Sequence, residues 1–291
     1  MRKWILIGGD KRQISVLENF RKRNILVSSW GIGKNDEATD WIREVETADV
    51  VVLPLPVTDD GVRIRCPLHP EIGMRFLSLI EHMKSGSIVL GGNIPTLWIE
   101  QAERSGVRIY DYFQSETLQM RNALPTVEAA LFLAMQALPV TLDGCKTAVL
   151  GYGRIASLLS EKLVALGAEV TVYARKEKDL AHARLRHCVA VPICKNNGVS
   201  ALHDLSEDCR IVFNTIPHLV VTESILRNWR RDCVLMELAS FPGGFDTMSV
   251  KEFDFPFILA SALPGKHFPE TAGNILADTL VDLVDMLEKH E

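Results

Sequence analysis

Short runs of aliphatic and β-branched residues alternate with helix-length amphipathic segments, and this alternation runs through the chain twice. In the first series we expect strands at 4–8, 25–28, 49–53, 87–91 and 107–110, and helices near 11–23, 71–83 and 96–105. Alternation of this kind is typical of parallel sheets covered by helices. It limits the chain to α/β architectures.

The second series predicts strands at 147–150, 169–173, 189–193, 210–214, 233–238 and 257–260, with helices near 155–166 and 177–186. A long helix is expected over 126–137, because Pro125 suits a first helical turn and Pro139 would end the helix. Residues 271–289 carry the apolar stripe of one amphipathic helix.

We therefore predict two doubly wound parallel-sheet domains with a cleft between them. Residues 1–121 would form a flavodoxin- or Rossmann-like domain for substrate or partner, to which a C-terminal helix at 270–291 returns. Residues 122–139 would link it to a Rossmann-type, NAD(P)-binding domain at 140–269. Ligands of such sheets bind at the carboxyl ends of the strands, so we expect the chemistry in the loops that follow them.

Composition excludes several classes of function. The 291 residues are 47% hydrophobic and 24% charged, with a net charge of −5 and no block of Lys or Arg, which argues against binding to nucleic acid or anionic lipid. The apolar runs are too short to span a bilayer or to form a signal peptide, so we expect a cytoplasmic protein. Six scattered cysteines without a Cys-x-x-Cys pair predict reduced thiols and no metal site.

The most informative local motif is Val-Leu-Gly-Tyr-Gly-Arg-Ile-Ala at 149–156, a G-x-G-x-x-A between an expected strand and an expected helix. Gly151 permits the tight turn, Gly153 lets a pyrophosphate approach the backbone, and Ala156 lets the helix pack closely on the strand. The motif predicts a dinucleotide cofactor. By contrast, Asp10 after Gly8-Gly9 places an acid where a phosphate would lie, which makes the first domain an unsuitable nucleotide site.

The following strand ends in Ala174-Arg175-Lys176, without the acidic residue that would bind a free ribose 2′-hydroxyl. This favours NADP, with NAD possible. The expected cofactor-binding residues are Gly151, Tyr152, Gly153, Arg154, Ile155, Ala174, Arg175, Lys176, Thr215, Ile216, Pro217, Leu238 and Ala239.

Three loops of the second half supply candidates for catalysis, at 214–218, 237–244 and 262–271. The catalytic candidates are His218, His267, Lys266 and Ser240. The substrate-binding candidates are Arg12, Asn122, Thr126, Glu128 and Lys266. Glu237, at the end of an apolar strand, either takes part in the site or simply caps or pairs, whereas Arg63, Arg65 and Arg104 are expected to be solvated charges.

Several of these segments together resemble a known family. They are residues 9–13 (Gly-Asp-Lys-Arg-Gln), 122–129 (Asn-Ala-Leu-Pro-Thr-Val-Glu-Ala), 214–217 (Asn-Thr-Ile-Pro), 238–244 (Leu-Ala-Ser-Phe-Pro-Gly-Gly), 263–266 (Leu-Pro-Gly-Lys) and 269–273 (Pro-Glu-Thr-Ala-Gly). Their order and spacing resemble the A subunits of bacterial dipicolinate synthase over nearly the full length. The chain departs from that pattern at Ala156, where the motif more often has Gly, and at Phe241, where many relatives have a basic residue.

The resemblance implies an enzyme related to the formate/glycerate and alanine dehydrogenases, acting in the mother cell of a sporulating bacterium. It implies oxidation of dihydrodipicolinate to pyridine-2,6-dicarboxylate with NAD(P)⁺, a flavoprotein-like second subunit, and a homo-oligomer. We expect Arg12 and Lys266 to hold the two carboxylates from opposite domains and Thr126, Asn122 and Ser240 to orient the substrate. His218 or His267 would accept the proton.

Two other functions stay open at this point. One is a 2-hydroxy- or amino-acid dehydrogenase, although the expected loops show no catalytic His paired with an acid. The other is a nucleotide-sensing subunit without catalytic activity of its own.

Overall fold

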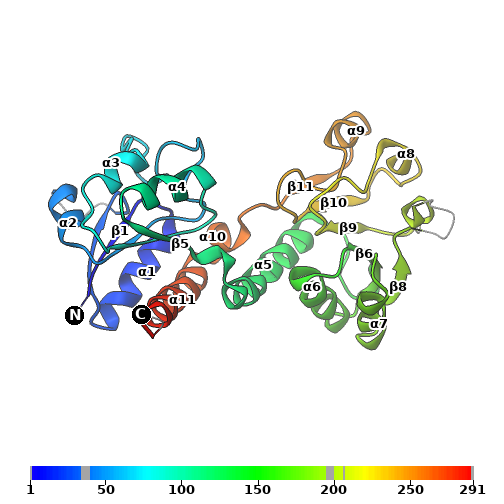
Figure 1. Cartoon of the computed structure of the whole chain (residues 1–291). Helices are drawn as coiled ribbons and strands as arrows, with labels where there is room; N and C mark the ends of the chain where they lie inside the picture. Colours follow the sequence, from blue (N-terminus) through cyan, green and yellow to red (C-terminus); the bar gives the residue numbers. More distant parts are fainter. Residues whose placement is uncertain (1, 34–39, 195–199, 206, 290–291) are drawn as a thin grey trace. The chain divides into compact units, whose positions relative to one another are not determined.

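The computed structural model describes residues 2–33, 40–194, 200–205 and 207–289. The chain divides into two compact units: unit 1 comprises residues 1–122 and 264–291, and unit 2 comprises residues 123–263. Figure 1 labels their elements. Each unit contains one parallel sheet with helices on its faces, which confirms the predicted fold class. The cleft between the two domains stays a prediction from the sequence.

Unit 1 is built on a five-stranded parallel sheet in the order β2-β1-β3-β4-β5. Its strands are β1 (Lys3–Ile7), β2 (Leu26–Trp30), β3 (Val50–Val52), β4 (Ile88–Gly91) and β5 (Arg108–Asp111). Its helices are α1 (Lys11–Lys22), α2 (Trp41–Thr47), α3 (Phe76–Ile80), α4 (Thr96–Arg104), the 3-10 helix η1 (Tyr112–Gln114) and α11 (Pro269–Lys289). The sequence did not predict α2, and it predicted a longer α3 than the structure has.

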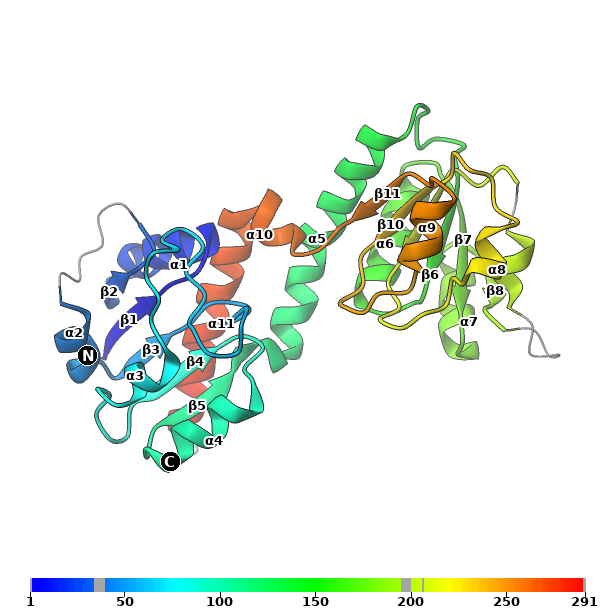
Figure 2. The same ribbon diagram turned by 90° about the horizontal axis from the view of Figure 1, so that it is seen from above.

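Alternation along β1 gives the sheet two apolar faces. Trp4 and Leu6 face α1 and α11, where Trp4 meets Phe20 edge-on with ring centroids 5.0 Å apart. Ile5 and Ile7 face the opposite core, which α2, α3 and α4 cover. Figure 2 shows α1 (blue) beside α11 (red). The C-terminal helix therefore completes the core of the unit in which the chain begins.

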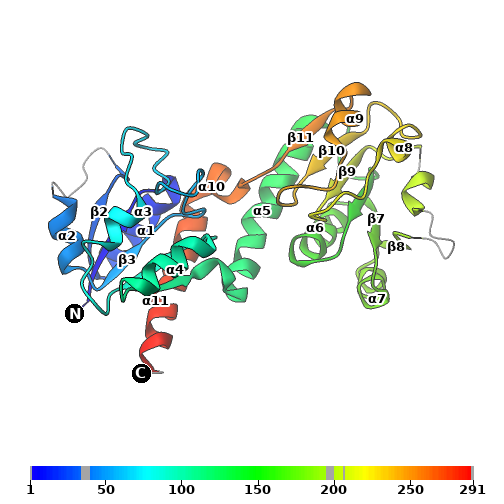
Figure 3. The ribbon, with the colours of Figure 1, turned by 45° about the horizontal axis from the view of Figure 1, so that its top comes forward.

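Unit 2 is built on a six-stranded parallel sheet in the order β11-β10-β9-β6-β7-β8. Its strands are β6 (Lys146–Leu150), β7 (Glu169–Ala174), β8 (Val189–Pro192), β9 (Ile211–Asn214), β10 (Val234–Glu237) and β11 (Phe257–Leu259). Its helices are α6 (Arg154–Ala165), α7 (Glu177–Leu185), η2 (Ala201–Asp204), α8 (Glu223–Leu226) and α9 (Thr247–Glu252). Figure 3 shows α6 and α7 on one side of this sheet and α8 and α9 on the other. The strand order reverses direction at β6, and ligands of such sheets bind at that point.

Helix α5 (Glu116–Ala137) connects the two units and corrects the prediction of a helix that begins at Thr126. Pro125 lies inside the helix rather than in its first turn. A proline in a helix interior removes one hydrogen bond, and the helix-forming residues on both sides hold the helix through it. Asn122 therefore lies on the helix, and the units divide inside α5, between Asn122 and Ala123.

A second correction concerns residues 262–271, which the sequence predicted to be a loop. They contain α10 (Leu263–His267) and the first turn of α11. Pro264 and Gly265 suggested a loop, but proline is well accommodated in a first helical turn. Within the described ranges, no helix is both long and apolar enough to cross a membrane.

Candidate functional site

The glycine-rich turn of unit 2 connects β6 to α6. Gly151 has φ +93°, and a Cβ at this position would lie 2.5 Å from Thr215 Oγ1. The Thr215 hydroxyl donates to the Leu150 carbonyl oxygen over 2.7 Å, so this neighbour is held in place. A Cβ on Gly153 would meet no atom within 4 Å, so open space lies over the start of α6. The turn thus has the close packing and the free space that a bound phosphate needs.

A cavity of about 160 Å³ adjoins this turn. The residues that line it are Gly151, Tyr152, Ala174, Arg175, Lys176, Asp179, Ile193, Ile216, His218 and Val220. Seven of them are residues that the sequence named as cofactor-binding or catalytic candidates, coming from the ends of β6, β7 and β9. Arg175 and Lys176 are exposed, so their charges are available to an anion. The cavity is therefore suited to the phosphorylated-ribose half of a dinucleotide.

His218 lines the same cavity as Arg175 and Lys176. His218 is therefore close to the residues that the sequence predicts to bind a ribose phosphate.

Glu237 and Asn214 form a buried polar pair at the ends of β10 and β9. Asn214 Nδ2 donates to Glu237 Oε1 over 2.6 Å, and Glu237 also accepts from the amides of Ala239 (2.9 Å) and Gly244 (2.7 Å). Both side chains are at most 4% exposed. The pair fixes the loop at 238–244, which includes the candidates Leu238, Ala239 and Ser240. Of the two alternatives for Glu237, the structure shows pairing and loop fixation.

In unit 1, Arg12 is buried beside Asp10 at the end of β1. Its Nε donates to Asp10 Oδ1 over 2.9 Å, and its Nη2 donates to Asp10 Oδ2 over 2.7 Å and to the Leu55 carbonyl oxygen over 2.5 Å. Burial raises the pKa of Asp10, but the hydrogen bonds and charge of Arg12, with a contribution from Arg65, outweigh it and leave that pKa below its usual value. Asp10 also caps α1 by accepting from the Arg12 amide. Arg12 therefore organises the loop after β3 as well as carrying charge.

The structure corrects the prediction that Arg65 is a solvated charge. Its side chain is 24% exposed, and its Nη1 lies 3.6 Å from Asp10 Oδ2. Its Nε donates to both carboxylate oxygens of Asp59 over 3.1 Å. Arg65 and Asp59 also line a cavity of about 230 Å³ in unit 1. The sequence could not predict that Arg65 pairs with Asp10, because the two residues are 55 positions apart in the chain.

Lys266 and His267 lie on α10 in unit 1, the same unit as Arg12. The prediction that Arg12 and Lys266 come from opposite domains is therefore wrong. A Cβ on Gly265 would lie 2.9 Å from Arg12 Nε, so α10 packs directly on the Arg12 side chain. The expected domain boundary missed this because residues 264–269 were assigned to the cofactor domain.

The remaining substrate-binding candidates lie on α5. Asn122 falls in unit 1, whereas Thr126 and Glu128 fall in unit 2. Glu128 is exposed, and Asn122 and Thr126 are partly buried. One turn of helix separates Asn122 from Thr126, so the two lie on the same face of α5.

Comparison with known proteins agrees with this arrangement. Residues 3–113 match the family described as the N-terminal domain of the dipicolinate synthase A subunit. The A subunit of dipicolinate synthase from Bacillus subtilis is 28% identical over 99% of this chain and 98% of its own length. Its crystal structure matches with a TM-score of 0.86, covering 100% of this chain and 98% of the relative. The chain is thus similar to a dipicolinate synthase A subunit over nearly its full length.

The dipicolinate synthase A subunit from Bacillus halodurans matches at 28% identity with a TM-score of 0.85, covering 97% of both chains. D-lactate dehydrogenase from Escherichia coli is 12% identical, with a TM-score of 0.62 over 99% of this chain and 98% of that one. This second likeness is one of fold. The chain therefore shares its fold of two parallel-sheet α/β units with these structures.

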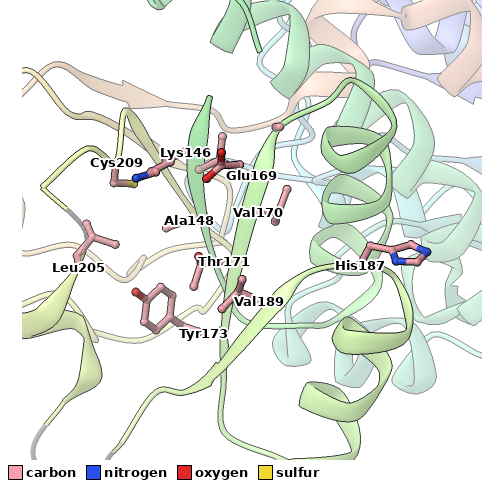
Figure 4. A pocket seen from close by; sticks show the side chains of 12 residues that line it. Lys146, Ala148, Glu169, Val170, Thr171, Tyr173, His187, Val189, Leu205 and Cys209 are labelled. Atoms are coloured by element: carbon pink, nitrogen blue, oxygen red, sulfur yellow. The ribbon is translucent and has the colours of Figure 1, made fainter. Parts of the chain in front are cut away.

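Another cavity of unit 2, of about 430 Å³, lies away from the glycine-rich turn (Figure 4). Lys146, Glu169 and Val189, which line it, are the first residues of β6, β7 and β8. It therefore opens at the amino ends of these strands, and ligands of parallel sheets bind at the opposite ends. We assign it no part in cofactor binding. Among the described residues, no group of three or more His, Cys, Asp or Glu side chains is arranged to hold a metal ion.

Proposed function

We propose that this chain is the oxidoreductase subunit of a dipicolinate synthase, and that it oxidises dihydrodipicolinate to pyridine-2,6-dicarboxylate with a nicotinamide cofactor. The observation that carries the proposal is the cavity of about 160 Å³ that joins the glycine-rich turn to Arg175 and Lys176. It occurs in a chain that matches a dipicolinate synthase A subunit over nearly its full length. NADP is the favoured cofactor because the side chains of Arg175 and Lys176 are cationic and exposed, and NAD is the alternative.

Different residues of unit 2 would bind different parts of such a cofactor. Gly151, Gly153 and the first turn of α6 would receive the pyrophosphate, with Tyr152, Arg154 and Ile155 beside it. Ala174, Arg175 and Lys176 would take the ribose phosphate, and Thr215, Ile216, Pro217, Leu238 and Ala239 would lie along the remainder. When bound, the cofactor supplies a hydride acceptor. The protein then has to bind and orient the substrate and to accept a proton.

The substrate is a dianion, and unit 1 offers the cation Lys266 for it, with Arg12 supporting the helix that carries it. Lys266 is exposed on α10, and Arg12 is fixed beside it by Asp10. Asn122, Thr126 and Ser240 would orient the ring, with Glu128 near them, in the cleft that the sequence predicts. Loss of one hydride and one proton gives an aromatic ring, so a modest base is enough, and His267 would accept the proton.

Similarity to the dipicolinate synthase A subunit of Bacillus subtilis supports the wider setting. We propose a flavoprotein-like second subunit as partner, assembly as a homo-oligomer, and action in the mother cell of a sporulating bacterium. These follow from resemblance to the family alone.

The test is an assay of the purified chain with dihydrodipicolinate and either NADP⁺ or NAD⁺, with and without the second subunit. Formation of pyridine-2,6-dicarboxylate, followed by its ultraviolet absorbance, is the expected result. Reduction of a simple keto acid in its place would indicate a 2-hydroxy- or amino-acid dehydrogenase. Cofactor binding without turnover in any of these assays, even with the second subunit present, would indicate a nucleotide-sensing subunit.

A further inference from the structure

One side chain of unit 2 is far more exposed than its chemistry leads one to expect. Phe241, at the tip of the loop at 238–244, is 97% exposed. Single apolar side chains on a surface are common and by themselves indicate nothing. What sets Phe241 apart is how firmly the loop beneath it is held.

The loop is held at both ends and across its middle. The Gly243 amide donates to the Ser240 carbonyl oxygen over 2.9 Å and closes a turn around Phe241. The Gly244 carbonyl oxygen accepts from the amides of Val220 and Val221, each over 2.9 Å, which ties this loop to the one after β9. The turn therefore presents Phe241 in a defined position.

Buried side chains support the same turn from below. Glu237 accepts from the amides of Ala239 and Gly244, and Asn214 donates to Glu237. A Cβ on Gly243 would lie 2.8 Å from Glu237 Oε2, and one on Gly244 would collide with Asn214 Nδ2. Because this packing leaves no room for side chains at 243 and 244, the loop rests directly on the buried pair.

The strand order then indicates what Phe241 meets. The cavity beside Arg175 and Lys176 is lined from the ends of β6, β7 and β9, with the two cations at the β7 end, and it suits the phosphorylated-ribose half of the proposed cofactor. The pyrophosphate would lie at the glycine-rich turn, so the other half extends in the opposite direction along the sheet, over β9 and then β10. The loop at 238–244 follows β10, so the nicotinamide end of such a cofactor would reach the loop that carries Phe241.

We propose that Phe241 binds the oxidised nicotinamide ring face to face. This inference rests on the proposed function. The oxidised ring is a flat pyridinium cation, and the electron-rich face of a phenyl ring attracts such a cation. The reduced ring is neutral and lacks that attraction. Phe241 therefore selects the oxidised form of the cofactor, which is the form that the proposed oxidation consumes.

The experiment is calorimetric titration of the full chain with NADP⁺, with NADPH, and separately with pyridine-2,6-dicarboxylate. Phe241→Ala is expected to raise the Kd for NADP⁺ about fivefold and that for NADPH less than about twofold. Phe241→Leu keeps apolar surface without an aromatic face, so it should lose nearly as much affinity for NADP⁺ as Phe241→Ala. Phe241→Tyr should retain the wild-type Kd. Leu185→Ala is the matched control, because Leu185 is 77% exposed at the end of α7, and its Kd values should not change.

Equal effects of Phe241→Ala on both forms of the cofactor, or none on either, would overturn the proposal. Full retention of NADP⁺ binding by Phe241→Leu would overturn it as well, and so would a loss confined to the dicarboxylate. If the wild-type chain binds neither form of the cofactor, the proposed function itself is refuted. Because Phe241 is exposed, loss of folding does not complicate the comparison, and thermal melting of each variant verifies this.

Discussion

Replacing Arg12 with Met tests whether the buried ion pair holds unit 1 together. The substitution removes the three side-chain hydrogen bonds that Arg12 makes to Asp10 and Leu55. Arg12 is 8% exposed, so Asp10 loses its main partner in a place with little access to water. Breaking a buried pair from one side costs about 3–5 kcal/mol. The Asp10 side chain keeps 23% exposure, which favours the lower end, about 3 kcal/mol.

Urea denaturation followed by tryptophan fluorescence measures this loss. Four of the five tryptophans, Trp4, Trp30, Trp41 and Trp98, lie in unit 1, so the signal reports mainly on that unit. A double-mutant cycle with Asp10→Asn isolates the contribution of the pair. The double variant should lose clearly less free energy of unfolding than the two single variants lose together. Arg63→Met is the matched control, because its pair with Asp60 is exposed and should contribute nothing measurable.

The dependence on pH has a definite sign. The pKa of Asp10 is lower in the folded chain than in the unfolded chain, so ionised Asp10 stabilises the fold at neutral pH. This contribution is complete above the unfolded value of about 3.9 and declines as the pH falls through the folded pKa. The deficit of Arg12→Met should therefore shrink in acid. The reasoning would be refuted if Arg12→Met lowered the free energy of unfolding at pH 7 no more than Arg63→Met does. It would also be refuted if the loss caused by Arg12→Met grew in acid.

Three further variants address unit 2. Gly151→Ala should abolish cofactor binding in calorimetry, because φ is +93° and the new Cβ would lie 2.5 Å from Thr215 Oγ1. Replacing Arg175 and Lys176 with Ala should raise the KM for NADP⁺ about tenfold or more and leave the KM for NAD⁺ nearly unchanged; equal changes would contradict binding of a 2′-phosphate there. Glu237→Gln should lower kcat more than it raises the cofactor KM, because it loosens the loop at 238–244 without touching the phosphate site.

The sheets were the part of the fold that sequence reasoning could predict. Each strand of a covered parallel sheet is a short run rich in apolar and β-branched residues, and Val50–Val52 or Ile211–Asn214 stand out for that reason. The glycine-rich turn was predictable too, because strand, turn and helix are contiguous. Such local signals do not depend on where the rest of the chain lies.

The features that the sequence missed depend on distant partners or on helix context. Pro125 indicated a helix start only because nothing local shows that the preceding turns are helical. Arg65 looked solvated because Asp10, 55 residues away, is what fixes it. The sequence placed Asn214 and Glu237 at strand ends and left capping or pairing open for Glu237, but that the two pair with each other across neighbouring strands becomes visible only with the strand order.

The electrostatics of anion binding change once Arg12 is seen in place. Arg12 and Arg65 are balanced by Asp10 and Asp59, so this four-residue cluster carries no net charge at neutral pH. A chain of net charge −5 that attracts a dianion and a phosphorylated cofactor must therefore do so with other cations. Lys266, Arg154, Arg175 and Lys176 are exposed and fit that need. Arg12 then acts chiefly by shape: it fixes the loop after β3 and supports α10, and so determines where Lys266 presents its charge.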